Sequence, residues 1–280
     1  MITAEFDYRR VSSVDEALSA LAEGGEDAKL LAGGHSLLPL MKLRLAAPSQ
    51  LIDLGDIAEL RGVQRENGGW RIGALTTHAT LESASELGVV AQAASEIADQ
   101  QVRNMGTIGG SLAHGDPASD LPAVVLALEG EVVARGPSGE RTIAAPDLFL
   151  DYLTTSLAPD EMITQVRLPA LEGWGWGYEK FTRRSEDWAM VGVCALVKGA
   201  GGVCEDVRVG LTHMASTPLR ARAVEDALRG QPLDEAHIAA AAQQAAAGTD
   251  PPGDLNASPN YKRHLARVLT RRALQTAAGS

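Results

Sequence analysis

Apolar and polar positions alternate over short distances in the first part of the chain. The spacing Ser13-Val14-Asp15-Glu16 is that of a capping box and predicts a helix that ends at Gly24-Gly25. Apolar runs over 29–32 and 50–54 predict strands, and the apolar stretch 36–45 between them has the character of a helix. Strand, helix and strand in this order indicate a small unit of the βαβ type.

The middle of the chain mixes strands and helices. Asn67-Gly68, with strand-like residues on both sides, predicts a tight hairpin. A glycine-rich stretch from Gly106 to Asp116 predicts a long loop. The other predicted elements are helices over 81–87, 89–100 and 121–129, a hairpin pairing 131–135 with 141–144, and a strand over 162–168 that Pro169 ends.

After Pro169 the pattern changes from mixed elements to strands followed by helices. Consecutive strands are predicted over 173–182, 188–198 and 203–214, and helices over 219–229, 234–247 and 258–274. Strands first and helices afterwards favour a separate α+β domain with a three-stranded antiparallel sheet. We therefore expect three parts, over residues 1–56, 57–172 and 173–280.

Composition and charge exclude several classes of protein. The 280 residues carry 25 Lys and Arg against 36 Asp and Glu, a net charge of −11, which is opposite to the basic footprint of a nucleic-acid binder. The longest apolar runs, such as 121–128, are far shorter than the ~18 residues of a membrane span. The N-terminus has no apolar signal segment. A cytoplasmic protein without a membrane span is the resulting expectation.

The two cysteines, Cys194 and Cys204, are too few to supply the four ligands of an iron–sulfur cluster or of a cysteine-rich zinc site. We interpret them as small apolar strand residues, and we predict no metal site in this chain. Any metal cluster that exchanges electrons with this protein would belong to another chain.

Two glycine pairs are the strongest candidates for chemistry. Ala32-Gly33-Gly34-His35-Ser36 and Thr107-Ile108-Gly109-Gly110-Ser111 each place adjacent glycines after an apolar segment and before a small hydroxyl residue. Adjacent glycines can aim successive backbone N–H groups at one point and so form an anion nest. Two such loops favour a ligand that contains phosphate, although each could also be no more than a tight turn.

Other site chemistries have weaker support. The P-loop and Rossmann glycine patterns are absent. Ser111, His114 and Asp116 could form a hydrolase triad on paper, but the G-x-S-x-G elbow is missing. His114, Asp116 and Asp120 could bind a metal, although ligands without a second histidine are weak evidence.

Several motifs together resemble one family along nearly the whole chain. The sequence is similar to the FAD-binding subunits of the molybdenum hydroxylases, the xanthine dehydrogenase and aerobic carbon monoxide dehydrogenase family, and most of all to the medium subunit of the carbon monoxide dehydrogenase type. The motifs that carry the resemblance are Leu31-Ala32-Gly33-Gly34-His35-Ser36, Thr107-Ile108-Gly109-Gly110-Ser111, Asp116-Pro117-Ala118-Ser119-Asp120-Leu121-Pro122, Tyr178-Glu179-Lys180-Phe181 with Asp187-Trp188-Ala189, and Asn260-Tyr261-Lys262-Arg263.

The resemblance implies an α+β fold with a PCMH-type FAD-binding domain of two subdomains and a C-terminal domain. Residues that match the cofactor positions of the family are Leu31, Ala32, Gly33, Gly34, His35, Ser36, Leu37, Leu38, Thr107, Gly109, Gly110, Ser111, Asp120, Ile163, Lys180 and Trp188.

Within that set the resemblance implies different tasks. Ala32–Leu38 would wrap the pyrophosphate, Asp120 would contact the adenosine half, and Ile163 would contact the flavin. Lys180 would lie near the isoalloxazine ring and adjust its reduction. Alternatives remain for three residues: Asp120 could be a helix N-cap, Lys180 an exposed strand lysine, and Trp188 a core tryptophan.

The function implied is that of an oxidoreductase subunit. A large molybdopterin-binding subunit would oxidise the substrate, a small subunit with two [2Fe–2S] clusters would relay electrons, and FAD in this chain would pass them to an external acceptor. The assembly implied is a dimer of heterotrimers, with the C-terminal helices and the flavin edge in contact with the small subunit. Ser111 stands where the eukaryotic xanthine dehydrogenases have asparagine, so NAD is not predicted as the acceptor. The alternative is a flavin-binding protein that acts without partner chains.

Overall fold

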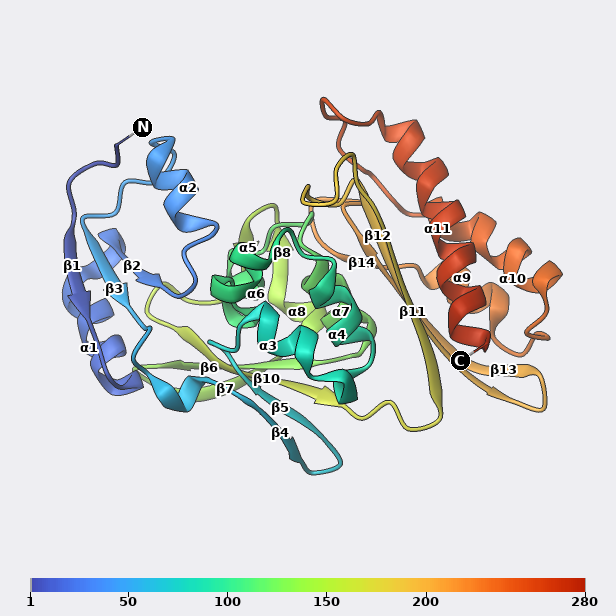
Figure 1. Cartoon of the computed structure of the whole chain (residues 1–280), viewed down its shortest axis with the longest axis horizontal. Helices are drawn as coiled ribbons and strands as arrows, with labels where there is room; N and C mark the ends of the chain where they lie inside the picture. The colour runs from blue at the N-terminus through green and yellow to red at the C-terminus, as the bar shows by residue number, and fades with distance from the viewer. Residues whose placement is uncertain (1, 280) are drawn as a thin grey trace.

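The N-terminal part is a small sheet with helix α1 packed on it, at one end of an elongated molecule (Figure 1). The computed structural model describes residues 2–279. Its first sheet is parallel, with strand order β1-β3-β2. The elements are β1 (Asp7–Arg10), α1 (Val14–Gly24), β2 (Ala28–Leu31), α2 (Leu37–Lys42) and β3 (Gln50–Asp53), with short 3₁₀ turns at η1 (Gly25–Asp27) and η2 (Ala58–Leu60).

The predicted capping of the first helix is confirmed. The Ser13 hydroxyl accepts a hydrogen bond from the Glu16 N–H at 3.2 Å, and the Glu16 carboxylate accepts one from the Ser12 N–H at 2.9 Å. Gly25 ends α1 with a φ of +60°, a conformation that glycine adopts without steric cost.

The central part contains a five-stranded antiparallel sheet with strand order β4-β5-β10-β6-β7. Both predicted hairpins are confirmed in it. The strands are β4 (Val63–Glu66), β5 (Gly69–Gly73), β6 (Glu131–Gly136), β7 (Gly139–Ala144) and β10 (Met162–Pro169), and a separate small pair is formed by β8 (Phe149–Asp151) and β9 (Thr154–Thr155). The helices of this part are α3 (His78–Ser83), η3 (Ser85–Leu87), α4 (Val89–Ser95), α5 (Gln100–Met105), α6 (Ile108–His114), α7 (Asp120–Ala127) and α8 (Ala145–Leu148).

The predicted loop from Gly106 to Asp116 is wrong, because most of it forms helix α6. Two glycines in a helix cost about 1 kcal/mol each relative to alanine, which is why the composition indicated a loop. The Thr107 side chain caps the helix, and the N–H groups of Ile108 and Gly109 donate to the carbonyls of Thr76 and Ala74 at 3.1 and 2.9 Å. These tertiary bonds offset the poor intrinsic propensity.

The C-terminal part has a four-stranded sheet with order β11-β12-β13-β14, where three strands are predicted. The strands are β11 (Trp174–Phe181), β12 (Val191–Ala200), β13 (Val203–Thr212) and β14 (Leu219–Arg220), and the helices are α9 (Arg222–Leu228), α10 (Glu235–Ala242), η4 (Gln243–Ala246) and α11 (Pro259–Gly279). The extra strand takes the first residues of the predicted helix 219–229. Arg220 fixes it there by ion pairs with Glu225 at 2.7 Å and Glu129 at 3.2 Å.

Helices cover both faces of this last sheet. Helices α4 and α7 pack on one face and α9 and α11 on the other (Figure 1). This explains why seven consecutive residues of β12, Val191–Val197, are all buried, since neither face of the strand meets water. The interpretation of Cys194 and Cys204 as buried strand residues is confirmed. Within residues 2–279, no helix has the length and apolar character needed to cross a membrane.

Candidate functional site

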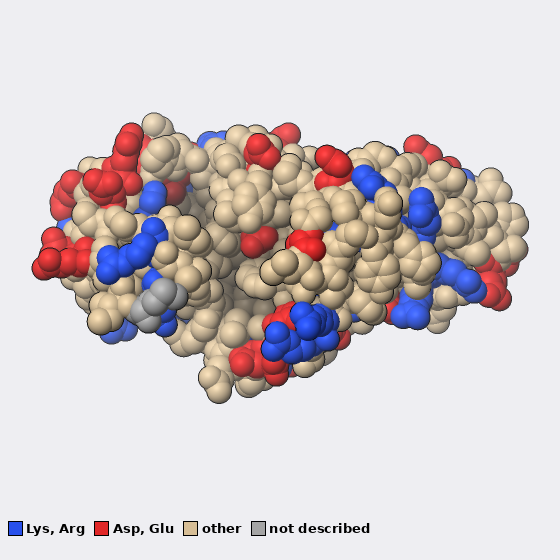
Figure 2. Space-filling model, turned by 90° about the horizontal axis from the view of Figure 1, so that it is seen from above, with Lys and Arg blue, Asp and Glu red and all other residues tan. Residues whose placement is uncertain are grey.

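A cavity of about 550 Å³ lies where the three parts of the chain meet. Figure 2 shows the molecule hollowed between its N-terminal lobe on the left and its central part, with few charged atoms on the visible walls. The sequence-predicted site residues that line the cavity are Leu31, Ala32, Gly33, Gly34, His35, Ser36, Leu37, Thr107, Gly109, Gly110, Ser111, Asp120, Ile163, Lys180 and Trp188. Leu38 is not among the lining residues; it packs beneath Gly34 instead.

The first glycine pair forms an open cradle between β2 and α2. Gly34 has a φ of +76°, and the N–H groups of Gly33, Gly34, His35 and Ser36 donate to no acceptor within the described part of the chain. A Cβ on Gly33 would lie 2.2 Å from the Met105 carbonyl oxygen, so only glycine fits there. Unpaired donors beside a cavity are what an anion nest offers to a phosphate.

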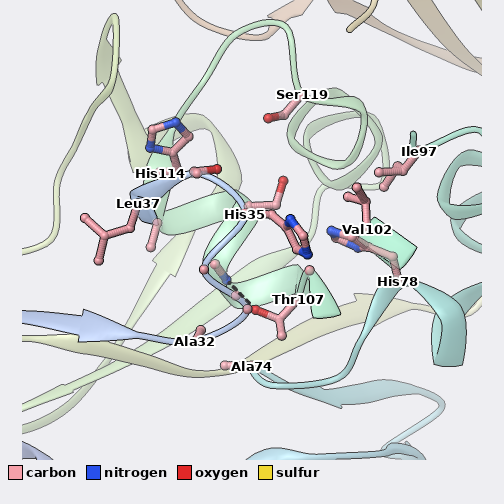
Figure 3. Close-up of a pocket in the computed structure, with 18 of the residues that line it drawn as sticks. Ala32, His35, Leu37, Ala74, His78, Ile97, Val102, Thr107, His114 and Ser119 are labelled. Carbon is pink, nitrogen blue, oxygen red and sulfur yellow. Dashed lines mark hydrogen bonds between the residues drawn. The ribbon is translucent and has the colours of Figure 1, made fainter. Parts of the chain in front are cut away.

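The second glycine pair is not a nest, which corrects the prediction. Every N–H of the first turn of α6 is already bonded: Gly110 donates to the Thr107 hydroxyl at 3.1 Å and Ser111 to the Thr107 carbonyl at 3.0 Å (Figure 3). A Cβ on Gly109 would lie 2.6 Å from the Cβ of Ala74. Gly109 therefore lets α6 pack closely against Ala74, directly after β5, and Gly110 lies beside Thr107 and Ala32.

Asp120 and Lys180 touch one another, although the resemblance assigns them to opposite ends of FAD. The Lys180 ammonium lies 2.9 Å from one Asp120 oxygen, and the Tyr178 hydroxyl donates to the other at 2.5 Å. Burial raises the pKa of Asp120, while the Lys180 charge and the Tyr178 hydrogen bond lower it. Because these side chains meet, we expect them to lie beside the same part of a bound cofactor.

The alternatives for three site residues are wrong. Lys180 is not an exposed strand residue, because only 3% of its side chain is accessible. Ser119, not Asp120, occupies the N-cap position of α7. Trp188 is not a core residue, since 55% of it is exposed at the edge of the cavity, whereas Ile163 is buried in the wall.

His78 is the main lining residue that sequence reasoning missed. It begins α3, is 5% exposed, and its ring faces His35 in the cavity (Figure 3). Burial, and then the charges of His35 and Arg103, lower its pKa from 6.5 to about 4, so the ring is neutral near pH 7. Its Nδ1 is buried without a hydrogen-bond partner in the chain. No local sequence pattern predicts that His78 lines the cavity, because a single histidine after a threonine N-cap belongs to no recognised motif.

Other missed lining residues come from segments that the folded chain brings together from far apart in sequence. They include Leu54, Ala74, Leu75, Ile97, Ala98, Val102 and Leu157. Most are apolar or small, and nothing in their local sequence distinguishes them from core residues.

The structure gives no support to a hydrolase triad or to a metal site. Ser111 and His114 lie on α6, and no hydrogen bond joins them in the part of the chain that the structure describes. Asp116 instead accepts from the Ala118 N–H at 2.8 Å. Among residues 2–279, no three His, Cys, Asp or Glu side chains are grouped to hold a metal ion.

Comparison with known proteins decides between the remaining candidates. Residues 4–171 match the family described as the FAD binding domain in molybdopterin dehydrogenase, and residues 176–277 match the CO dehydrogenase flavoprotein C-terminal domain. The chain belongs to the FAD-binding medium subunits of the molybdenum hydroxylases.

Similar proteins agree with this family along their whole length. The chain is 43% identical to the carbon monoxide dehydrogenase medium chain of Hydrogenophaga pseudoflava, over 99% of this chain and 98% of that one. It is 39% identical to the nicotine 6-hydroxylase medium subunit of Paenarthrobacter nicotinovorans, over 95% of each. A solved carbon monoxide dehydrogenase from Hydrogenophaga pseudoflava superimposes with a TM-score of 0.97 at 44% identity, covering 100% of this chain and 99% of that chain. The α+β fold and the assignment as an oxidoreductase subunit that binds FAD are thereby confirmed.

The cavity of this medium subunit fits FAD. Its volume lies within the ~300–1,000 Å³ typical of small-molecule sites. The unpaired N–H groups of residues 33–36 suit a pyrophosphate, and the apolar side chains of Leu31, Leu37 and Ile163 suit the faces of a flat ring. The unpaired Nδ1 of His78 adds a buried polar group beside the same space.

Proposed function

We propose that this chain is the electron-transfer subunit of a molybdenum hydroxylase complex. It takes electrons from the [2Fe–2S] clusters of a small partner subunit and passes them to an external acceptor, while a large molybdopterin-binding subunit oxidises the substrate. The observation that carries the proposal is the match of the whole chain, in sequence and in fold, to medium chains of such enzymes. A flavin supplies the required chemistry, because it exchanges electrons one or two at a time.

The residues of this chain divide the work of holding the cofactor. The backbone N–H groups of Gly33, Gly34, His35 and Ser36 bind the pyrophosphate, and Thr107 and the segment 109–111 form the adjoining wall of the cavity. Leu31, Ala32 and Leu37 cover one face of the cofactor, while Leu38 supports the cradle from below. Ile163 and Trp188 exclude water from the ring system.

Electrons must reach this chain from elsewhere in the complex. Its two thiols are buried in β12 and β13, where burial raises the pKa of Cys194 to about 12 and of Cys204 to about 11, so neither is a thiolate ligand. Cluster ligands are therefore the small subunit's task. Trp188, exposed at the cavity edge, and the C-terminal helices form the surface that we expect this subunit to cover.

We expect the assembly that the family resemblance implies. A permanent complex with a small and a large subunit, paired into a dimer of heterotrimers, requires a total buried area above about 2,000 Å². The substrate is chosen by the large subunit, and two of the medium subunits similar to this chain come from enzymes named for carbon monoxide and for nicotine.

The test is to purify the chain from its own host with an affinity tag and to analyse what comes with it. We expect iron, molybdenum and FAD in fixed proportion to the tagged chain, and a flavin that is reduced after substrate is added without oxygen. Denaturation should release FAD and not FMN, because the cradle is built for a pyrophosphate.

A matched pair of variants separates cofactor loss from misfolding. Gly34→Val should yield a complex that retains iron and molybdenum, lacks FAD and no longer reduces the external acceptor. Gly68→Val, at a hairpin glycine with the same φ of +76° but outside the cavity, should retain FAD. A tagged chain that purifies alone with full FAD, and without iron or molybdenum, would instead identify a flavoprotein that acts without partners.

A further inference from the structure

A buried cluster of three side chains joins the C-terminal sheet to the cavity wall. Asp120 begins α7, and Tyr178 and Lys180 follow one another on the same face of β11. Both oxygens of the Asp120 carboxylate have partners, the Tyr178 hydroxyl at 2.5 Å and the Lys180 ammonium at 2.9 Å. The side chains of Asp120 and Lys180 are 5% and 3% exposed, and Tyr178 is 4% exposed.

Backbone contacts hold the ammonium in place. Lys180 also donates to the Glu96 carbonyl at 2.8 Å, directly after α4. The Gln92 side chain bonds the backbone N–H and carbonyl of Tyr178, both at 3.2 Å, and so ties β11 to the same helix. An ammonium has three N–H donors, and two of these are used by Asp120 and Glu96. The cation therefore has a fixed position at the cavity wall.

The positive charge of Lys180 and the negative charge of Asp120 offset one another, and this sets the electrostatic potential in the cavity. Charges in a poorly hydrated wall act over a longer range than charges in water. Lys180 without Asp120 would present an uncompensated positive charge, and Asp120 without Lys180 a negative one. Tyr178 stays a neutral donor, because burial and the Asp120 charge raise its pKa well above 10.

We propose that Asp120 is a positioning residue and the counter-ion of Lys180, rather than a ligand of the cofactor ribose. It fixes the ammonium at the cavity wall and offsets most of its charge, and so it sets the reduction potential of the flavin bound there. Each of its carboxylate oxygens already accepts a hydrogen bond within the chain, and only 5% of its side chain is exposed, so the carboxylate is committed first to Lys180 and Tyr178. This inference rests on the proposed function, because it requires FAD in the cavity.

The experiment is a redox titration of the bound flavin in the purified complex, with variants that change one charge at a time. Asp120→Asn keeps an oxygen acceptor and the side-chain shape but removes the negative charge, so the midpoint potential should rise. Lys180→Met keeps the apolar stem but removes the positive charge, so the potential should fall. Tyr178→Phe leaves both charges in place and should change the potential least of the three.

The double variant Asp120→Asn with Lys180→Met removes both charges and should return the potential toward that of the wild type. Opposite shifts that cancel in the double variant are an electrostatic signature, which a merely structural role would not produce. If Asp120→Asn alone does not fold, the double variant should still fold and hold FAD, because no unpaired charge remains in it.

Two results would overturn the assignment. One is a midpoint potential that shifts in the same direction, or does not shift, in the flavin-replete Asp120→Asn and Lys180→Met complexes. The other is a folded Asp120→Asn complex that has lost FAD while the double variant has lost it equally, which would identify Asp120 as a cofactor ligand. Failure of both Asp120→Asn and the double variant to fold would overturn the assignment as well. A wild-type chain without FAD or without partner chains would contradict the proposed function itself.

Discussion

The two glycine pairs border the same cavity and look alike in sequence, yet their backbones are used in different ways. Gly33-Gly34 follows a strand and leaves a row of N–H groups without acceptors. Gly109-Gly110 lies inside α6, where each N–H already has a partner within the chain. The first pair presents donors to a ligand, and the second removes side chains so that a helix can lie close to β5.

The difference shows that the residues before a glycine pair decide whether its N–H groups stay free for a ligand. Thr107 caps α6 and consumes the N–H of Gly110, which turns the second motif into a helix start. Leu31, at the corresponding position before Gly33, has no side-chain acceptor, so the donors of residues 33–36 stay open. The shared feature that favoured two nests, a hydroxyl residue after each glycine pair, does not distinguish the two, whereas Thr107 before the second pair does.

The largest effect is expected from Gly33→Ala. The new Cβ would lie 2.2 Å from the Met105 carbonyl oxygen and 2.8 Å from the Gly106 Cα, and backbone atoms cannot move aside as a side chain can. We expect a loss of about 3 kcal/mol or more in the free energy of unfolding, at the upper end for an overpacked site. Denaturant titration measures it, and a change below about 1 kcal/mol would show that the two segments are not packed as described.

The acid stability of the chain should depend on His78, which lies between the two glycine motifs. A histidine with a pKa of about 4 in the folded chain and 6.5 when unfolded binds fewer protons in the folded state between these values. Stability is therefore lost as the pH falls from about 6.5 to about 4, by on the order of 3 kcal/mol. Unfolding titrations across this range should show that slope in the wild type.

His78→Asn removes the titrating group and should flatten the slope. His35→Gln removes one of the charges that lower the pKa of His78, so the folded-state pKa should rise toward 6.5 and the total loss of stability on acidification should become smaller. An Asn variant with the full wild-type slope would assign the acid sensitivity to another group.

Gly109→Ala tests the packing role of the second pair. Its Cβ would lie 2.6 Å from the Ala74 Cβ and 2.7 Å from the Ala74 carbonyl oxygen, so α6 must move away from β5. We expect a destabilisation of about 2 kcal/mol in the free energy of unfolding of the FAD-free chain. An unchanged FAD-free stability combined with weaker FAD binding would instead make Gly109 a direct cofactor contact.

Gly34→Ala tests the cradle role of the first pair and should have the smallest effect on stability. Gly34 and Gly68 share a φ of +76°, so alanine at either position should cost about 1 kcal/mol of backbone strain. Only Gly34→Ala should also weaken FAD binding, by about tenfold or more, which corresponds to about 1.4 kcal/mol. Equal FAD affinity in the two variants, measured by flavin fluorescence, would remove the cradle from the binding site.

Local signals predicted much of the fold. The Ser13 cap and the Asn67-Gly68 turn depend on neighbouring residues and were found as expected, and the apolar strand predicted over 188–198 is found as β12 over 191–200. Helix α6 and strand β14 were missed because long-range contacts hold them, the N–H bonds to Ala74 and Thr76 in one case and the ion pairs of Arg220 in the other.

The site residues that belong to sequence motifs could be predicted. The glycine segments, Lys180 and Trp188 all reach the cavity, because the resemblance located them by pattern. His78 and the contact between Asp120 and Lys180 were not predictable, since both depend on how segments far apart in sequence meet. Burial of Lys180 likewise comes from helix packing over β11, and an isolated strand sequence does not reveal it.

Amide hydrogen exchange in the FAD-free and FAD-loaded protein tests the central difference most directly. The amides of residues 33–36 have no acceptor among residues 2–279, so they should exchange rapidly without FAD and become protected when FAD binds. The amides of residues 108–111 are bonded already and should be protected in both states, with little change. A large gain of protection at 108–111, or none at 33–36, would contradict the assignment of one pair to binding and the other to packing.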